Sequence, residues 1–71
     1  MEHRFTLTRE FIALNDLLKL TGICSSGGEA KAVIASEAVR VNGELELRKT
    51  YKVRAGDVIE LDGVKLVVDA G

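Results

Sequence analysis

The basic side chains between residues 40 and 54 are the part of this sequence best suited to chemistry on a ligand. The segment holds half of the chain's ten lysines and arginines in about a fifth of its length, and its only acids are Glu44 and Glu46. An arginine guanidinium can fork onto phosphate oxygens, and a row of cations neutralises a nucleic-acid backbone. The pattern predicts a groove that follows phosphates, and the alternative is an ordinary solvated strand face. The basic residues are Arg40, Arg48, Lys49, Lys52 and Arg54.

The turn Ser26-Gly27-Gly28 is a second candidate for contact with an anion. A helix N-terminus presents unpaired N–H groups to anions, and two glycines leave the approach open. Lys31 lies one turn further along. Ser26 and Glu29 also have the spacing of a capping box, in which each side chain bonds the backbone N–H of the other. The turn could therefore equally be a plain capping box with small residues for close packing.

Residues suited to catalysis or metal binding are scarce. His3 is the only histidine and Cys24 the only cysteine, which excludes an internal disulfide and a structural zinc site with four histidine or cysteine ligands. No second histidine can activate Cys24, so we expect it to be a small buried hydrophobic residue. We predict no catalytic residue, no metal and no cofactor.

Length and composition bound the class of protein. Seventy-one residues, 46% hydrophobic and 30% charged, predict one small globular domain over residues 1–71. A formal net charge of −1 excludes binding to polyanions through bulk charge. The first residues lack the basic and apolar runs of a signal peptide, and no apolar stretch approaches the roughly 18 residues of a membrane span. We expect a cytoplasmic monomer.

Two short helices are predicted in the first half of the chain. Leucines recur at helical spacing ahead of Gly22, a residue suited to the position after a helix, which predicts a helix over about residues 14–20. The turn at Ser26 predicts a second helix over about residues 27–36.

The second half of the chain has the period of β-strands. Apolar residues alternate from residue 38 onward, with turns at 42–43, 55–57 and 62–63, and a further strand is predicted at residues 4–8. Helices followed by antiparallel strands predict an α+β fold, with both helices on one side of a small, mostly antiparallel sheet. The expected core is Leu14, Leu17, Leu18, Ala30, Val33, Ile34, Val39, Val41, Val53, Val58, Ile59 and Leu61.

The dipeptide Asn42-Gly43 is a strong hairpin signal, but it does not by itself decide between a loop of two and a loop of three residues. A two-residue loop would pair Val41 with Glu44 and put a carboxylate on the apolar face. A three-residue loop instead pairs Val41 with Leu45. We therefore predict a three-residue loop with a bulge and with positive φ at Gly43 or its neighbour. The other predicted pairs are Val39 with Leu47 and Arg40 with Glu46.

Three successive motifs follow one another along the chain: the spacing of Gly22, Ser26, Ala30 and Ile34, the run Val-Arg-Val-Asn-Gly at 39–43, and the run Val-Arg-Ala-Gly-Asp-Val-Ile at 53–59. Together they resemble the S4 RNA-binding domain. The resemblance covers about residues 14–61 and is greatest to the short stand-alone bacterial S4-like proteins. It implies an αL motif, with two short helices packed on a small sheet. It also implies that RNA is gripped by the start of the second helix and by the adjoining strand and hairpin. Carried over by position, the RNA contacts are Ser26, Gly27, Gly28, Lys31, Arg40, Arg48, Lys49 and Lys52, and the charge pattern adds Arg54.

The chain departs from the S4 pattern at two positions. Gly27 stands where the family has an arginine or lysine, which removes a phosphate contact. Glu37 stands where the family has a glycine, which costs about 1 kcal/mol if φ is positive there.

These observations predict a non-catalytic RNA-binding protein with a structured RNA as its partner. Scarce aromatic residues argue against a protein that stacks the bases of single strands. Ribosomal RNA, transfer RNA and a structured messenger element all stay open, as does association with the ribosome. The alternatives are a protein-binding adaptor, for example on the ribosome, and a β-grasp sulfur carrier, although the tail Asp-Ala-Gly lacks the penultimate glycine of such carriers.

Overall fold

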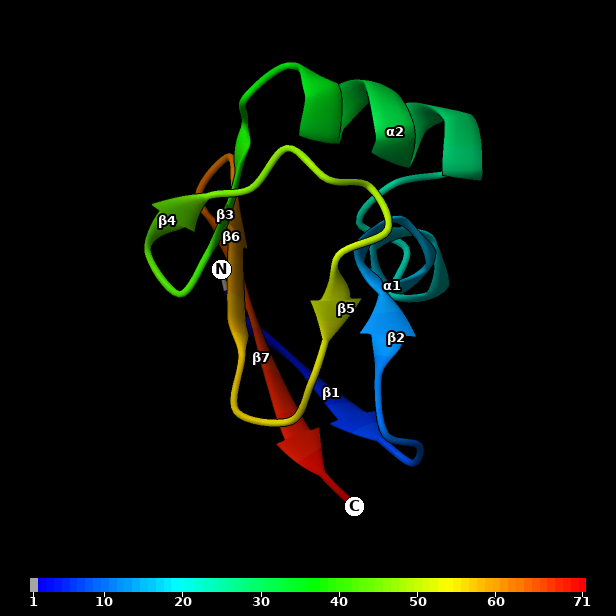
Figure 1. Ribbon diagram of the computed structural model, residues 1–71, viewed down its shortest axis with the longest axis vertical. Helices are drawn as coiled ribbons and strands as arrows, with labels where there is room; N and C mark the ends of the chain where they lie inside the picture. The colour runs from blue at the N-terminus through cyan, green and yellow to red at the C-terminus, as the bar shows by residue number, and fades with distance from the viewer. Residues whose placement is uncertain (1) are drawn as a thin grey trace.

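The computed structural model describes residues 2–71, which fold into two helices and two β-sheets (Figure 1). The elements are β1 (Glu2–Leu7), β2 (Ile12–Ala13), α1 (Leu14–Leu20), α2 (Gly27–Ala35), β3 (Val39–Val41), β4 (Glu44–Leu45), β5 (Lys52–Val53), β6 (Val58–Leu61) and β7 (Val64–Ala70). The larger sheet has the strand order β1-β7-β6-β3-β4, and its neighbouring strands are antiparallel except for β1 and β7. The smaller sheet is the antiparallel pair β2-β5. The predicted α+β class is confirmed.

The helices form where leucine spacing and turn residues predict them. Helix α1 has the predicted bounds and is followed by Gly22 with φ of 79°. Helix α2 begins after Ser26, whose hydroxyl oxygen accepts a hydrogen bond from the N–H of Glu29, and it ends at Ala35. Both helices lie on the same side of the larger sheet in Figure 1.

The core lies between the helices and the alternating apolar face of the larger sheet. All the predicted core residues are buried except Val33 and Val58, which are partly buried. Because burial alternates along β6 and β7, Ile59 and Leu66 face the helices from directly opposed positions. The core residues that were not predicted are Leu7, Ile12, Cys24, Leu66 and Val68, of which only Cys24 was expected to be buried.

The prediction of a three-residue hairpin loop is wrong. Val41 pairs with Glu44, and the turn has two residues, Asn42 and Gly43, with φ of 52° and 84°. Positive φ at both positions is the type I′ geometry that matches the twist of the flanking strands. The Val39–Leu47 and Arg40–Glu46 pairs are wrong for the same reason: Arg40 pairs with Leu45, and the N–H of Glu46 donates to the carbonyl of Val39 at 3.0 Å.

The charge argument against the two-residue loop failed because the acids are accommodated. Glu44 is exposed at the edge of the sheet, and the carboxylate of Glu46 is held by Arg48 at 2.9 Å. Leu45 is left 40% exposed, a minor cost for a single surface residue.

No helix within residues 2–71 is long and apolar enough to cross a membrane.

We predict that Glu37→Gly raises the free energy of unfolding by about 1 kcal/mol. Glu37 follows α2 with φ of 66°, a conformation that costs a residue with a Cβ more than it costs glycine. Chemical denaturation measures the change. Glu37→Ala is the control, since it keeps the strained Cβ and should give no comparable gain. Equal stability of the two variants would contradict the prediction.

Candidate nucleic-acid interface

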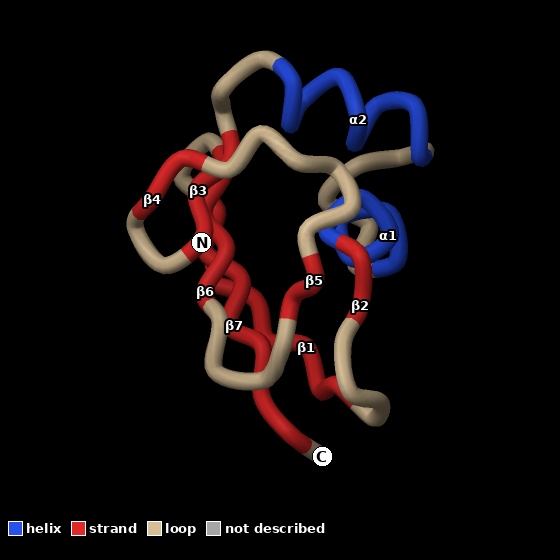
Figure 2. The backbone as a smooth tube through the Cα atoms, in the orientation of Figure 1, coloured by secondary structure: helices blue, strands red, loops and turns tan. Residues whose placement is uncertain are grey.

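The loop that carries Arg48 and Lys49 is held against the start of α1 by hydrogen bonds of its own backbone. The N–H of Leu14 donates to the carbonyl of Tyr51, and the N–H of Asn15 donates to the carbonyl of Lys49, both at 2.9 Å. The residue before α1 is Ala13, which makes no side-chain cap, so the loop carbonyls take up the first N–H groups of the helix. Ala13 also pairs with Lys52 in the β2-β5 sheet. These contacts fix the course of the loop between β4 and β5, drawn in tan in Figure 2.

Three of the predicted basic residues meet at one hollow of about 360 Å³. They are Arg48, Lys52 and Arg54, all exposed, and Thr50 and Tyr51 complete the lining. Lys49, also exposed, lies between them in the chain. Burial alternates through β5, with Val53 fully buried, which turns Lys52 outward. The predicted outward direction of Lys52 and Arg54 is confirmed.

Arg48 is oriented by an acid and by an aromatic ring. The carboxylate of Glu46 accepts hydrogen bonds from Nε at 2.9 Å and from Nη2 at 3.2 Å, and also from the backbone N–H of Arg48 at 3.0 Å. The guanidinium carbon lies 5.2 Å from the centroid of the Tyr51 ring. The hydrogen bonds from Arg48 hold the pKa of Glu46 below its ordinary value. A phosphate would therefore share Arg48 with a carboxylate that is already bound to it.

The start of α2 is sterically open, but a carboxylate lies beside it. A Cβ at Gly27 would meet nothing within 4 Å. Only half of the predicted capping box forms, because the carboxylate of Glu29 accepts from the N–H of Ser25 at 3.0 Å and from its hydroxyl, not from the N–H of Ser26. The Ser25 hydroxyl, and then its N–H, lower the pKa of Glu29. This charge opposes the attraction of the helix end for another anion. Lys31 is exposed one turn further along.

Arg40 lies apart from the hollow of Arg48, Lys52 and Arg54. It pairs with Glu60 across β3 and β6, and Glu60 pairs in turn with Lys65 across β6 and β7. These side chains line a different hollow of about 230 Å³, which also contains Asp62. Acids therefore offset the charge of Arg40 on this face of the sheet.

Sequence reasoning missed the aromatic partners of the basic residues. Lys52 Nζ lies 5.1 Å from the centroid of the Phe11 ring, and Arg48 stands over Tyr51. The short spacing of Arg48 and Tyr51 in the chain could have suggested their contact. The contact of Lys52 with Phe11 depends on the pairing of β2 with β5, which is a tertiary feature.

Metal binding and nucleophilic catalysis have little support among residues 2–71. Within residues 2–71, no group of three or more His, Cys, Asp or Glu side chains could hold a metal ion. Cys24 is buried, and burial, followed by the nearby charge of Glu29, raises the pKa of its thiol. A thiol with a raised pKa is a poor nucleophile, in agreement with the predicted packing role.

Comparison with known proteins supplies the family. A family model described as the S4 domain matches residues 5–69. This chain belongs to the S4 domain family. The resemblance seen in the sequence is therefore confirmed, and the β-grasp alternative is set aside.

The S4 relatives of this chain include proteins of similar length. The "Probable ribosome maturation protein RlbA" of Bacillus subtilis (strain 168) is 36% identical over 63 residues, which cover 89% of each chain. The "Putative RNA-binding protein YbcJ" of Escherichia coli (strain K12) is 42% identical over 59 residues, which cover 83% of this chain and 84% of that protein.

Two solved structures share the fold. The solution structure of E. coli YbcJ, described as revealing an αL motif involved in RNA-binding, matches with a TM-score of 0.75 and 40% identity. The match covers 94% of this chain and 86% of that one. The crystal structure of the 30S ribosomal protein S4e from Thermoplasma acidophilum matches with a TM-score of 0.62 and 27% identity, over 82% of this chain and 31% of that one.

We predict that Glu46→Gln weakens the dependence of stability on pH in acid. The pKa of Glu46 is lowered in the folded state, so this carboxylate stabilises the fold above its unfolded pKa of about 4.5 and loses that effect as the pH falls through the lower folded value. The wild type should therefore lose more stability below pH 4.5 than the variant. Glu44→Gln is the control, because it removes a charge without breaking the contact with Arg48. Superimposable profiles of free energy against pH for Glu46→Gln and the wild type would contradict the prediction.

Proposed function

We propose that this S4 domain, acting as one unit over residues 1–71, binds structured RNA without catalysing a reaction. The observation that carries the proposal is the meeting of Arg48, Lys52 and Arg54 at one hollow. The names of its relatives support it, since E. coli YbcJ is named as RNA-binding and its αL motif is described as involved in RNA-binding. The proposed contacts are Ser26, Gly27, Gly28, Lys31, Arg40, Arg48, Lys49, Lys52 and Arg54.

The RNA is a folded one that is recognised mainly through its phosphates. The basic residues at the hollow come from the loop before β5, from β5 and from the residue after it, and backbone hydrogen bonds to α1, β2 and Asp57 fix this stretch, so the spacing of the cations is set before RNA arrives. A rigid array of cations matches the phosphate positions of an RNA with a particular shape, and it depends little on the base sequence. Arg40 is a peripheral contact in this proposal because Glu60 lies opposite it.

The relatives also support a place for this chain on the ribosome. One is named as a ribosome maturation protein and one structural neighbour is a ribosomal protein. We infer that the RNA is ribosomal and that the protein works in the cytoplasm as a monomer. An adaptor that binds a ribosomal protein is the second candidate, favoured by the exposure of Leu45 and Leu47 beside the edge strand β4.

We predict that the double variant Lys52→Ala/Arg54→Ala binds a ribosomal RNA fragment with a weaker dependence on salt. Each phosphate contact contributes roughly 0.7–0.9 to the slope of log K against log salt, so losing two contacts should reduce the slope by about 1.4–1.8. Titration at several salt concentrations measures the slope. Arg4→Ala/Lys65→Ala is the control, since it removes the same charge from β1 and β7 and should leave the slope nearly unchanged. Equal slopes for the two double variants would contradict the proposal.

We also predict that Gly27→Arg strengthens binding to the same RNA. The position has open space for a side chain and lies at the first turn of α2, where the wider family carries a basic residue. One added contact should increase the salt slope by roughly 0.7–0.9. Ala35→Arg adds the same single charge at an exposed position at the other end of α2 and is the control for charge. A Gly27→Arg protein that binds no better than Ala35→Arg would show that the start of α2 does not face the RNA.

A further inference from the structure

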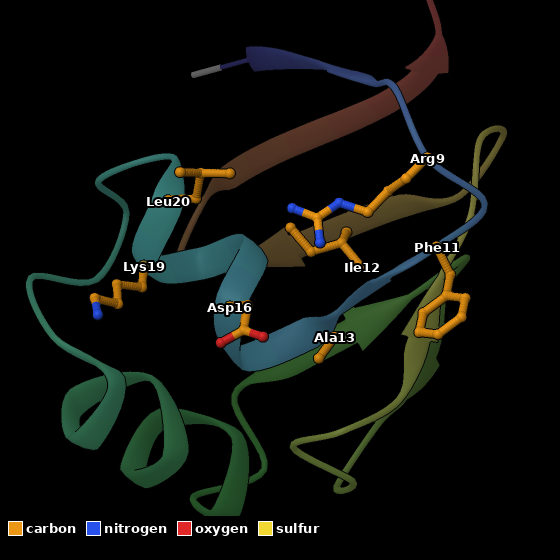
Figure 3. Close-up of a pocket in the computed structure, with 7 residues that line it drawn as sticks. All are labelled: Arg9, Phe11, Ile12, Ala13, Asp16, Lys19 and Leu20. Atoms are coloured by element: carbon orange, nitrogen blue, oxygen red, sulfur yellow. The ribbon is translucent and has the colours of Figure 1, made fainter.

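A third hollow lies between the segment that leads into β2 and the exposed face of α1 (Figure 3). Its volume is about 520 Å³, which lies within the roughly 300–1,000 Å³ typical of small-ligand sites. It is distinct from the hollow of Arg48, Lys52 and Arg54 and is not part of the contacts proposed above. The lining residues are Arg9, Phe11, Ile12, Ala13, Asp16, Lys19 and Leu20.

The hollow has an apolar surface that includes a flat ring. Phe11 is 38% exposed and Leu20 is 62% exposed, although both are large hydrophobic residues. Figure 3 shows Phe11 at one end of the hollow and Leu20 at the other, with the Arg9 side chain between them. An exposed aromatic ring in a concave surface suits a flat ligand, because stacking buries both faces that touch.

Cations outnumber acids around this apolar surface. Arg9 and Lys19 belong to the lining, and Lys52 Nζ lies 5.1 Å from the centroid of the Phe11 ring. Asp16 is the one acid of the lining, and its carboxylate can accept hydrogen bonds. The complementary ligand has a flat apolar part, at least one hydrogen-bond donor, and negative charge beside it. A nucleotide has all three.

Lys52 connects this hollow to the proposed RNA surface. It lines the hollow of Arg48 and Arg54 on one side and contacts Phe11 on the other, and it pairs with Ala13 in the β2-β5 sheet. An acidic peptide with an apolar side chain would also complement the charge. The shared position of Lys52 favours RNA, because a phosphate backbone that crosses Arg48, Lys52 and Arg54 passes next to the hollow of Phe11.

We propose that this hollow receives one unstacked base of the bound RNA. The base stacks on Phe11, its exocyclic amino group donates to Asp16, and the flanking phosphates lie near Arg9 and Lys19. Uracil has no exocyclic amino group, and its one edge donor, N3–H, is flanked by two carbonyl oxygens that repel a carboxylate, so adenine, cytosine and guanine are preferred to it. The inference rests on the proposed RNA binding, and it adds one extruded nucleotide to an interaction made otherwise through phosphates.

The test uses three RNA hairpins that differ at one point: no bulge, a single bulged adenosine, or a single bulged uridine. Dissociation constants are measured at one salt concentration. The wild type should bind the adenosine bulge most tightly. Phe11→Leu keeps an apolar residue but loses the ring, and it should weaken binding of that hairpin by about five- to a hundredfold, while binding of the unbulged hairpin stays the same.

Four further variants make the result specific. Phe11→Tyr keeps the ring and should keep the preference for the bulge. Leu45→Ala truncates a hydrophobic residue of similar exposure on β4 and should also keep it. Asp16→Ala should bind the adenosine and uridine bulges equally, and Asp16→Asn, which retains an acceptor oxygen, should restore the preference. Thermal melts establish that each variant is folded.

Equal, salt-dependent binding of all three hairpins by the wild type would overturn this inference and leave the proposed RNA binding in place. Failure to bind any hairpin at low salt would overturn both. A peptide of alternating leucine and glutamate provides the remaining arm. If the peptide shifts the NMR signals of Phe11 and Leu20 while the bulge has no effect on affinity, the hollow belongs to a protein segment and the inference is overturned.

Discussion

The two backbone hydrogen bonds between the start of α1 and the loop before β5 are the constraint on which the proposed interface depends. A helix that begins after Ala13 has no side chain to accept its first N–H groups, and leaving them unpaired in a partly buried position would be costly. The carbonyls of Lys49 and Tyr51 accept these N–H groups at 2.9 Å. The same interaction therefore starts the helix and fixes the basic segment. A change that shifts α1 would displace the cations, even without touching any of them.

Carboxylates inside the proposed surface act on the same cations and helix end that a phosphate would use. Glu46 forms a two-point contact with Arg48, and Glu29 lies at the start of α2 through its bonds to Ser25. Such contacts orient the side chains in advance, which lowers the entropy lost on binding. They also reduce the electrostatic gain, because a phosphate meets charge that is already partly neutralised. The smaller loss of entropy and the smaller electrostatic gain together favour an RNA whose shape matches the surface over tight binding of any polyanion.

How far the sequence predicts this structure depends on how local each signal is. Both helices, the cap at Ser26 and the positive φ at Gly22 and Gly43 come from residues within a few positions of one another, and they are confirmed. The hairpin register was predicted wrongly because the cost of placing Glu46 near the apolar face depends on Arg48, which binds it after the chain leaves the sheet.

In the candidate site too, local features were predicted correctly and long-range features were not. The charge cluster was visible in the sequence, and Lys52 and Arg54 do share a hollow with Arg48. The separation of Arg40 could not be predicted, because it follows from the order of strands that places Glu60 opposite Arg40 and Lys65 next to Glu60. The contact of Phe11 with Lys52 requires two residues 41 positions apart to meet across the short β2-β5 pair, and this pairing is too brief to leave a period in the sequence.

The separation of charge explains how a protein with a net charge of −1 could bind a polyanion. On the outer face of the sheet, Arg40, Glu60 and Lys65 alternate in sign across neighbouring strands, so that face attracts RNA only weakly. The stretch from the loop before β5 to Arg54 carries cations, and two acids contact it: Glu46 binds Arg48, and Asp57 accepts a hydrogen bond from the backbone N–H of Arg54. At physiological salt, charges more than about 8 Å apart are largely screened, so the net charge does not oppose a contact made at this surface. In the proposed mode of binding, RNA is held only when it faces the β2-β5 side of the molecule, and the hollows on either side of Lys52 would decide which RNA shapes can approach this side closely.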